Sequence, residues 1–218
     1  VMFIDLDSFK MVNDTMGHNV GDTVLNEVSR GLEQRLRKTD TVARFGGDEF
    51  LILVNNLADN EAIIKVVESL MKMFTHPFNI NGQEFYITGS AGIAVYPFDG
   101  EDAETLIKNA DIAMYMAKSK GRNQYTLCTV DMKEEVKQNI KLSNHLYRVQ
   151  ERDELILYYQ PQIKLTTGQI IGLEALLRWN HPEMGMILPN AFIPLAEMNG
   201  TINSIGEWVI KTAVRQNK

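Results

Sequence analysis

The alternation of apolar and polar positions predicts a series of strands in the first 129 residues. Residues 1–6 form a nearly continuous apolar run that leads into Asp5 and Asp7, and the two-residue period of a strand places both carboxylates on one side. Two further apolar runs flank a pair of glycines and predict a tight hairpin. The strands are expected at residues 1–6, in the hairpin at 41–54, at 84–96 as one long strand, and at 123–129.

Apolar residues spaced three or four apart predict amphipathic helices between these strands. The helices are expected within residues 9–16, 24–36, 63–74 and 106–117. Asp22 is well placed to cap the second of them. The order of elements is the β-α-β-β-α-β arrangement with an extra helix and strand appended, which indicates a mixed α/β fold. In this arrangement the first strand lies beside the hairpin at the centre of the sheet.

Carboxylates follow the paired glycines of the hairpin directly, as Asp48 and Glu49. A solvated turn is the simpler interpretation of an isolated Asp-Glu pair. However, the predicted topology places Asp5 opposite this pair, on a neighbouring strand. Carboxylates that converge at one edge of a sheet form the hard-oxygen pocket that holds Mg²⁺ together with substrate phosphates. The sequence therefore favours a metal site over a solvated turn.

Composition narrows the range of partners. The chain has 218 residues and a net charge of -6, which argues against a protein that coats nucleic acid or an anionic membrane. Cys128 is the single cysteine, so no internal disulfide forms and a reducing cytoplasm is expected. No apolar run reaches the length of about 18 residues that a membrane span needs. The chain opens inside a predicted strand, so we expect an upstream segment in the parent protein, where a membrane anchor stays possible.

Several separated motifs in residues 1–128 resemble those of the GGDEF-type diguanylate cyclase domain. The matching stretches are Phe3–Lys10, Asn13-Asp14, Gly17-His18, Gly21-Asp22, the signature Gly46-Gly47-Asp48-Glu49-Phe50, and Ala117–Asn123. The resemblance implies a nucleotide-cyclase or polymerase-palm-like sheet with flanking helices. It also implies the family's reaction, in which two GTP molecules condense into cyclic di-GMP with release of pyrophosphate. Each of two facing domains holds one GTP, so a homodimer is expected.

The resemblance assigns the metal-binding and catalytic roles. Asp5, Asp48 and the backbone carbonyl of Leu6 match the family's ligands for Mg²⁺ (or Mn²⁺). Glu49 matches the residue that assists deprotonation or holds a second metal, and the sequence leaves these two roles open. Two metals there would neutralise the charge of the triphosphate and lower the pKa of the attacking 3′-hydroxyl.

The resemblance also assigns the residues that bind the substrate. Asn13 and Asp22 match the guanine readers, because a carboxylate accepts hydrogen bonds from both N1–H and N2–H of guanine. The alternative for Asp22 is a helix cap. Lys118 and Arg122 match a phosphate clamp, although alone they would be ordinary surface charges. Further phosphate contacts are expected from Lys10 and from the amides near Ser8 and Phe9.

Two more features concern the ends of this domain. Arg37 and Asp40 match the family's RxxD product-inhibition motif at the expected offset from the signature, where they would bind cyclic di-GMP. Past Cys128, residues 130–152 predict a solvated linker helix. The domain boundaries are therefore expected at 1–129, 130–152 and 153–218.

Residues 153–218 resemble the start of an EAL-type phosphodiesterase, which hydrolyses cyclic di-GMP. Two strands, at residues 155–161 and 170–179, flank a turn, and Gln160, Glu174 and Arg178 match positions that contact ligand or metal in that family. Its β/α barrel takes about 250 residues. We therefore expect an incomplete barrel start and no phosphodiesterase activity from this chain.

The sequence supports three functional hypotheses. The first is a Mg²⁺-dependent, cytoplasmic diguanylate cyclase with GTP and cyclic di-GMP as small-molecule partners, and with neither nucleic acid nor membrane bound by this segment. The second is a GTP-binding regulatory GGDEF module of a composite protein whose net activity is cyclic di-GMP hydrolysis. The third is a product-sensing or dimerising scaffold that acts through Arg37 and Asp40. The complete acidic set favours the first.

Overall fold

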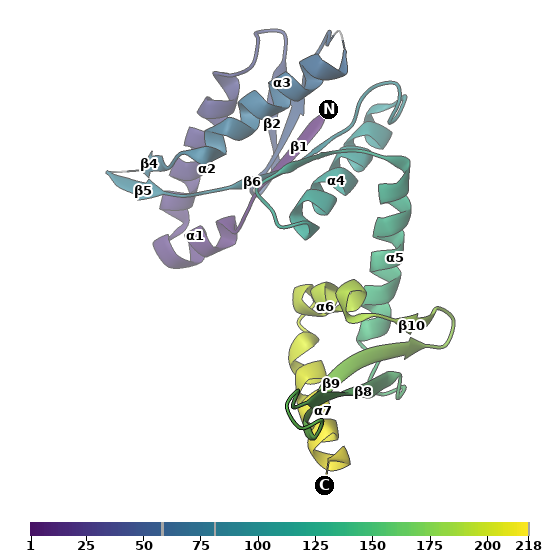
Figure 1. Ribbon diagram of the computed structural model, residues 1–218. Helices are drawn as coiled ribbons and strands as arrows, with labels where there is room; N and C mark the ends of the chain where they lie inside the picture. Colours follow the sequence, from purple (N-terminus) through teal and green to yellow (C-terminus); the bar gives the residue numbers. More distant parts are fainter. Residues whose placement is uncertain (58, 81, 218) are drawn as a thin grey trace. The chain divides into compact units, whose positions relative to one another are not determined.

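The computed structural model describes residues 1–57, 59–80 and 82–217. The chain forms two compact units, Val1–Val136 and Lys137–Lys218, and helix α5 (Val130–Leu146) spans the boundary between them. The prediction of a mixed α/β fold is confirmed (Figure 1).

The first unit is built on a five-stranded sheet in which β1 lies at the centre. The strand order is β2-β3-β1-β6-β7, and all pairs are antiparallel except the parallel pair of β6 and β7. The predicted hairpin is present as β2 and β3. The strands are β1 (Met2–Leu6), β2 (Thr41–Gly46), β3 (Glu49–Leu53), β6 (Gly89–Ile93) and β7 (Tyr125–Leu127).

Helices cover both faces of this sheet (Figure 1). Helices α2 and α3 pack on one face and α4 on the other, because alternate residues of β1 point to opposite sides. The helices of this unit are α1 (Phe9–Met16), α2 (His18–Glu33), α3 (Asn60–Met71) with the following 3₁₀ turn η1 (Lys72–Thr75), and α4 (Ala103–Ser119).

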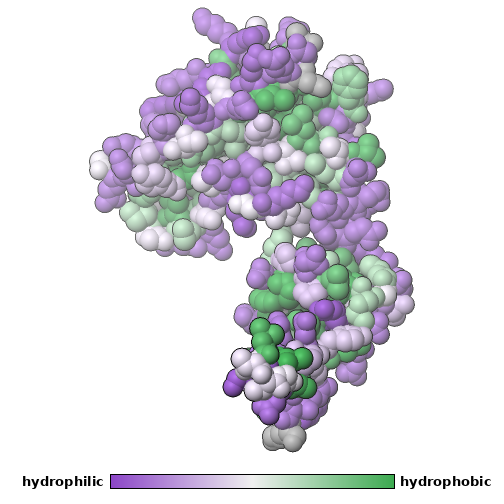
Figure 2. Space-filling model, in the orientation of Figure 1, coloured by the Kyte–Doolittle hydropathy of each residue, from purple (hydrophilic) through white to green (hydrophobic). Residues whose placement is uncertain are grey.

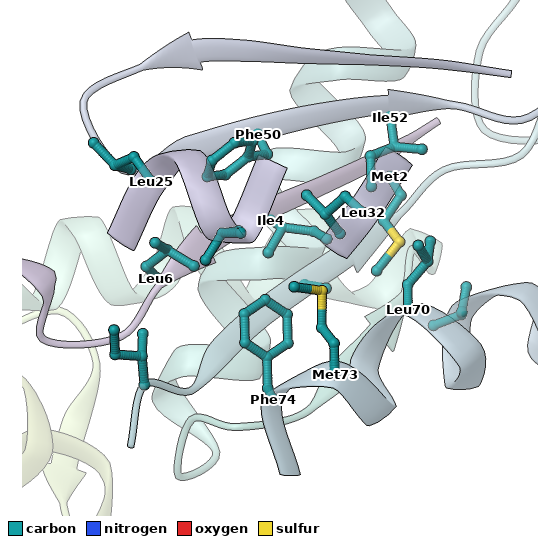
Figure 3. Close-up of a cluster of buried hydrophobic side chains, with 14 of the residues drawn as sticks. Met2, Ile4, Leu6, Leu25, Leu32, Phe50, Ile52, Leu70, Met73 and Phe74 are labelled. Atoms are coloured by element: carbon teal, nitrogen blue, oxygen red, sulfur yellow. The ribbon is translucent and has the colours of Figure 1, made fainter. Parts of the chain in front are cut away.

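The alternation along β1 produces two separate apolar layers. Met2, Ile4 and Leu6 point into the main core, where Figure 3 shows them packed with side chains of β3, α2, α3 and η1. Phe3 points the other way, into a smaller cluster against α4. Asp5 shares the α4 side with Phe3, so the fold delivers this carboxylate to the sheet face that α4 covers.

Close packing of α4 on the sheet depends on Gly92 in β6. A Cβ atom at this position would lie 1.9 Å from the carbonyl oxygen of Ala110 and 2.1 Å from the amide nitrogen of Met114. Both are backbone atoms of α4, so a side chain at residue 92 would force the helix away from the strand.

The expected long strand at 84–96 is wrong. The segment divides into β5 (Gln83–Phe85), which pairs with β4 (Phe78–Ile80) in a separate two-stranded sheet, and β6 in the main sheet. The break occurs where Thr88 turns toward Asp7, whose amide donates to the Thr88 carbonyl oxygen at 2.9 Å. Local alternation predicted the strands but not the change of pairing partner between them.

The second unit packs two helices on a short sheet of strand order β10-β9-β8. Its elements are β8 (Leu155–Ile163), β9 (Ile170–His181), β10 (Gly185–Ile187), α6 (Pro189–Met198) and α7 (Ile202–Gln216). Trp179 and Phe192 form the centre of its core, with ring centroids 5.6 Å apart. The described residues form no closed barrel.

The expected helix at 130–152 is shorter than predicted, because α5 ends at Leu146. Leu142 and Leu146 are buried in the core of the second unit, so the end of this helix belongs to a folded body. The hydrophilic surface over much of both units is visible in Figure 2. No helix in the described part of the chain is long and apolar enough to cross a membrane.

Candidate functional site

The turn between β2 and β3 fixes the positions of the two adjacent carboxylates. Gly47 has a φ of 51°, a left-handed conformation that glycine adopts without steric cost. Its carbonyl oxygen accepts a hydrogen bond of 2.8 Å from Nε of Arg44. Glu49 then begins β3 opposite Gly46. Asp48 therefore lies at the turn and Glu49 on the first paired residue of the strand.

The sheet register brings Asp5 to this turn. Asp5 of β1 is the direct partner of Glu49 in β3, and the next residue, Leu6, donates its amide to the carbonyl oxygen of Asp48 at 3.2 Å. Asp5 is only 8% exposed. The structure thus brings together the four positions to which the resemblance assigns metal binding.

Burial is the largest influence on the pKa values of Asp5 and Glu49. Burial raises the pKa of Asp5, and Asp48 and Asp7 raise it further, whereas the hydrogen bond and charge of Lys118 lower it. Burial also raises the pKa of Glu49, followed by repulsion from Asp5 and from Asp111. Excess negative charge in a partly buried site favours a cation or a proton.

These acids fit a divalent metal that is bound jointly by the protein and by substrate phosphates. Within the described ranges, no group of three or more His, Cys, Asp or Glu side chains is arranged to hold a metal ion. Magnesium, however, is commonly bound by one or two carboxylates together with substrate phosphates and water, without an all-protein cage. Asp5, Asp48 and Glu49 supply hard oxygen donors of this kind.

A polar pocket of about 230 Å³ lies beside the turn. It contains the expected guanine readers, Asn13 from α1 and Asp22 from α2. A Cβ atom at residue 21 would lie 1.9 Å from Oδ1 of Asn13, so Gly21 permits the close contact of the two helices. The pocket is lined by Phe9, Lys10, Asn13, His18, Asp22, Leu25, Arg44, Gly47 and Asp48.

The expectation that Asp22 caps a helix is wrong. Helix α2 begins at His18, directly after Gly17, so Asp22 lies within the first turns of the helix. Because the helix starts earlier than the apolar spacing indicated, the carboxylate of Asp22 is not the cap and lies at the pocket instead.

The two expected phosphate-binding cations occupy different environments. Nζ of Lys118, in the last turn of α4, lies 2.7 Å from Oδ1 of Asp5. Arg122 follows in the turn after α4, with a φ of 62°, and is exposed. At the other side, Ser8 precedes α1 with a φ of 59°, while Phe9 and Lys10 line the pocket.

The RxxD residues form a turn before β2. Oδ2 of Asp40 accepts from the amide of Arg37 at 2.9 Å, and Oδ1 accepts from the amide of Asn55 at 3.3 Å. Asp40 therefore shapes the loop, while the side chain of Arg37 is exposed. Their role in product binding stays a prediction.

Sequence reasoning missed several neighbours of the acidic site. Asp111 lies on α4 two turns before Lys118, and with Glu49 it lines a second pocket of about 520 Å³. The seven-residue spacing of Asp111 and Lys118 was the available signal, because it places both on one helix face. Arg44 and His18 also line the first pocket; the Gly17-His18 pair matched a family motif, but neither side chain was assigned a role.

In the second unit, the three residues matched to the EAL family lie on one face of the β8–β9 hairpin. Gln160 is the direct partner of Glu174, and the two-residue alternation of β9 places Arg178 on the same side as Glu174. Gln160 and Glu174 are exposed. The opposite face carries Trp179 into the core.

The sheet of the first unit is antiparallel except for the β6–β7 pair, is backed by helices, and carries acids at the junction of its central strand and hairpin. These features define the class of the first unit as a palm-like α/β domain. The family models then make the assignment specific. The chain belongs to the GGDEF family, since the model for "Diguanylate cyclase, GGDEF domain" matches residues 1–124, and the model for "EAL domain" matches residues 143–218.

Curated relatives carry the same two domains over nearly the whole chain. The chain is 44% identical over 216 residues to the bifunctional diguanylate cyclase/cyclic di-GMP phosphodiesterase MucR of Pseudomonas aeruginosa, covering 99% of this chain and 31% of that protein. It is 41% identical over 216 residues to the cyclic di-GMP phosphodiesterase PdeR of Escherichia coli, covering 99% and 32%. The chain thus spans about a third of the length of these relatives.

Solved structures agree with the fold of the first unit. The GGDEF domain of YfiN (TpbB) from Pseudomonas aeruginosa matches with a TM-score of 0.61 and 34% identity, over 62% of this chain and 80% of that one. An EAL/GGDEF domain protein from M. capsulatus matches with a TM-score of 0.56 and 43% identity, over 59% and 83%.

Proposed function

We propose that the first unit is a diguanylate cyclase that condenses two GTP molecules into cyclic di-GMP and releases pyrophosphate. One observation carries the proposal: Asp5 of the central strand is paired with Glu49 beside Asp48, next to a pocket that contains Asn13 and Asp22. This arrangement joins a place for metal-bound phosphates to a place for a guanine base.

GGDEF and EAL domains generally use divalent metal ions. In this chain Asp5, the carbonyl oxygen of Leu6, Asp48 and Glu49 would hold Mg²⁺ (or Mn²⁺). When bound, the metal neutralises triphosphate charge and lowers the pKa of the attacking 3′-hydroxyl.

The side chains then have separate tasks. Asn13 and Asp22 hold the guanine through its N1–H and N2–H groups, which adenine lacks. Lys118 and Arg122 bind the phosphates, with Lys10 and the amides of Ser8 and Phe9 at the other side of the pocket. These contacts keep the triphosphate against the acidic turn and orient the α-phosphorus for attack.

Glu49 is suited to receive the proton of the 3′-hydroxyl. Burial and the neighbouring acids raise its pKa, which brings a carboxylate closer to the pH at which a general base is most effective. The 3′-oxygen forms a bond to the α-phosphorus of the second GTP, and the bond from that phosphorus to the oxygen leading to the β-phosphate breaks. Two such steps close the ring and release two pyrophosphates.

Two properties of the chain support a homodimer with product feedback. The pocket beside the acidic turn contains one pair of guanine readers, Asn13 and Asp22, so a second copy of the domain would supply the second GTP. Arg37 is exposed beside the loop that Asp40 shapes, and we assign these two residues to binding of cyclic di-GMP as an inhibitor.

A second candidate function follows from the relatives. MucR is described as bifunctional and PdeR as a phosphodiesterase. The first unit would then be a GTP-binding regulatory module of a GGDEF–EAL protein whose net activity is cyclic di-GMP hydrolysis. The grouping of Gln160, Glu174 and Arg178 on one strand face favours a ligand-binding role for the EAL part of that protein.

Turnover of GTP by the full 218-residue chain with Mg²⁺, analysed by chromatography of the product, tests the proposal. Asp48→Asn and Glu49→Gln should each lower cyclic di-GMP formation by about 100-fold or more, because each removes a metal ligand or base. Glu61→Gln is the matched control, since Glu61 is an exposed residue of α3 that pairs with Lys65, away from the acidic turn. Binding of GTP without turnover would select the regulatory module instead.

A further inference from the structure

Asp7 is a buried carboxylate to which the proposed reaction gives no task. It is 8% exposed and lies just past the end of β1. Its oxygens accept hydrogen bonds of 2.7 Å from the hydroxyl groups of Thr88 and Ser90, and one of 3.1 Å from the amide of Asn123. No salt bridge to Asp7 occurs in the described ranges of the chain. Its partners are therefore the start of β6 and the turn after α4.

The turn that Asp7 contacts has an unfavourable backbone conformation. Gly121, Arg122 and Asn123 have φ values of 118°, 62° and 48°, so three successive residues are left-handed. Residues with a Cβ atom adopt this region only where the surroundings determine it. Within the turn, Arg122 donates its amide to the carbonyl oxygen of Ala117 at 3.2 Å. Asp7 supplies the bond to the next amide from 116 residues away in the sequence.

Two acids from the end of β1 thus attach to the end of α4. Asp5 contacts Lys118 at 2.7 Å, and Asp7 binds the amide that follows Arg122. Thr88, directly before β6, and Ser90, within β6, each donate a hydrogen bond to the carboxylate of Asp7. The bond from the Asn123 amide to Asp7 ties the turn to the end of β1, next to the bond of 3.0 Å from the Ala91 amide to the carbonyl oxygen of Gln124.

We propose that Asp7 is a positioning residue that holds the turn 121–123 in its left-handed conformation and thereby directs Arg122 to the triphosphate. The proposal rests on the proposed function, because it takes Arg122 as a phosphate-binding residue. Asp7 itself contacts neither metal nor nucleotide. Its loss should weaken the contacts to phosphate and leave the contacts to guanine intact.

Calorimetric binding to the full chain in Mg²⁺ tests this with two probes that lack the attacking hydroxyl, 3′-deoxy-GTP and 3′-deoxyguanosine. Asp7→Ala should weaken 3′-deoxy-GTP about tenfold and leave 3′-deoxyguanosine unchanged, since only the former uses Arg122. Arg122→Ala should have a similar effect. The double variant should bind 3′-deoxy-GTP no more weakly than Arg122→Ala alone, because both changes remove one interaction.

Matched variants separate positioning from general damage. Asp7→Asn retains a carbonyl oxygen that can accept from the Asn123 amide and should restore most of the affinity. Asn123→Gly should rescue Asp7→Ala, because glycine adopts a positive φ without support from Asp7. Ser90→Ala removes one of the two hydroxyl groups that hold Asp7 while Thr88 remains, so it should weaken the binding of 3′-deoxy-GTP less than Asp7→Ala does. If Asp7→Ala does not fold, Asp7→Ser replaces it, because the serine side chain is too short to reach the Asn123 amide.

The outcomes distinguish the two proposals. If the unaltered chain does not bind 3′-deoxy-GTP, the proposed function is overturned. If Arg122→Ala binds 3′-deoxy-GTP as tightly as the unaltered chain, the assignment of Arg122 to phosphate binding is overturned. If those results are as expected but Asp7→Ala retains its affinity, or loses both probes equally without rescue by Asn123→Gly, only the role of Asp7 is overturned.

Discussion

The β2–β3 hairpin of the first unit and the β8–β9 hairpin of the second both carry residues matched to the chemistry of their families, but their surroundings differ. Glu49 begins a strand that pairs with the central strand β1, and α4 covers its face of the sheet with Lys118 and Asp111. Glu174 and Gln160 lie on a face of β8–β9 that is exposed. In both hairpins, strand pairing and alternation bring the matched residues close together on the sheet.

The comparison shows that placing side chains on one face of a strand is not sufficient to shift their pKa values. The pKa of Glu49 is raised first by burial and then by the acids of neighbouring elements. Such an effect needs a second layer of structure over the strand. In the second unit, the layer of α6 and α7 covers only the face that carries Trp179. Ile163, Leu165 and Ile171 of the second unit are exposed apolar side chains.

Gly92→Ala is expected to have the largest effect, a loss of stability in the first unit without a loss in the second. The new Cβ would meet backbone atoms of α4 at 1.9 and 2.1 Å, so the helix must shift from the sheet. We expect a loss of about 3 kcal/mol in the free energy of unfolding of the first unit. Far-UV circular dichroism should report the loss, while tryptophan fluorescence, from Trp179 and Trp208 in the second unit alone, should keep its transition.

Gly206→Ala is the matched control for this prediction. Nothing lies within 4 Å of a Cβ at residue 206 in α7, so alanine should stabilise the second unit by about 0.5–1 kcal/mol through its helix propensity. A fluorescence transition that moves with Gly92→Ala would contradict the expectation that the second unit unfolds separately from the first.

A smaller loss of stability is expected in the second unit when the pH falls. His181 is buried, its Nδ1 accepts from the amides of Glu183 and Met184, and its Nε2 faces Nδ1 of His145. Burial and His145 lower the pKa of His181 below its ordinary 6.5, although Glu154 and Glu183 oppose this. The unfolded chain therefore binds a proton first.

Stability from His181 is thus complete above pH 6.5 and declines as the pH falls from there toward the lower folded pKa. We expect a loss of about 1 kcal/mol between pH 7 and 5.5, measured by urea unfolding followed by tryptophan fluorescence. His181→Gln, which cannot be protonated in this range, should reduce the slope. A slope unchanged by this substitution would assign the effect to another group.

The smallest effect compares the two glutamates directly. Because the raised pKa of Glu49 means that its charge is unfavourable in the folded state, Glu49→Gln should stabilise the first unit slightly, by on the order of 0.5 kcal/mol at pH 7. Glu174→Gln should leave the second unit unchanged, since Glu174 is exposed. Thermal melting of Glu49→Gln and Glu174→Gln measures both effects. Equal changes in melting temperature would contradict the difference in the surroundings of the two glutamates.

The sequence by itself determined the local elements and the acidic turn. Apolar periodicity predicted the helices and the hairpin, because burial of one face imposes a regular spacing on neighbouring residues. The glycine at residue 47 predicted a turn that needs a positive φ, which the structure has. The motifs of residues 1–124 and the start of the EAL segment were also sufficient to assign both families.

Only the tertiary structure decided which distant groups meet. Helix α2 begins at His18, so Asp22 lies inside the helix and is not its cap. Strand β5 pairs with β4, which divides the expected long strand. The packing of α4 places Asp111 near Glu49. The bond between Asp7 and Asn123 joins residues 116 positions apart. Periodicity carries information about a few neighbouring residues, whereas such contacts depend on sheet register and on the crossing of helices over it.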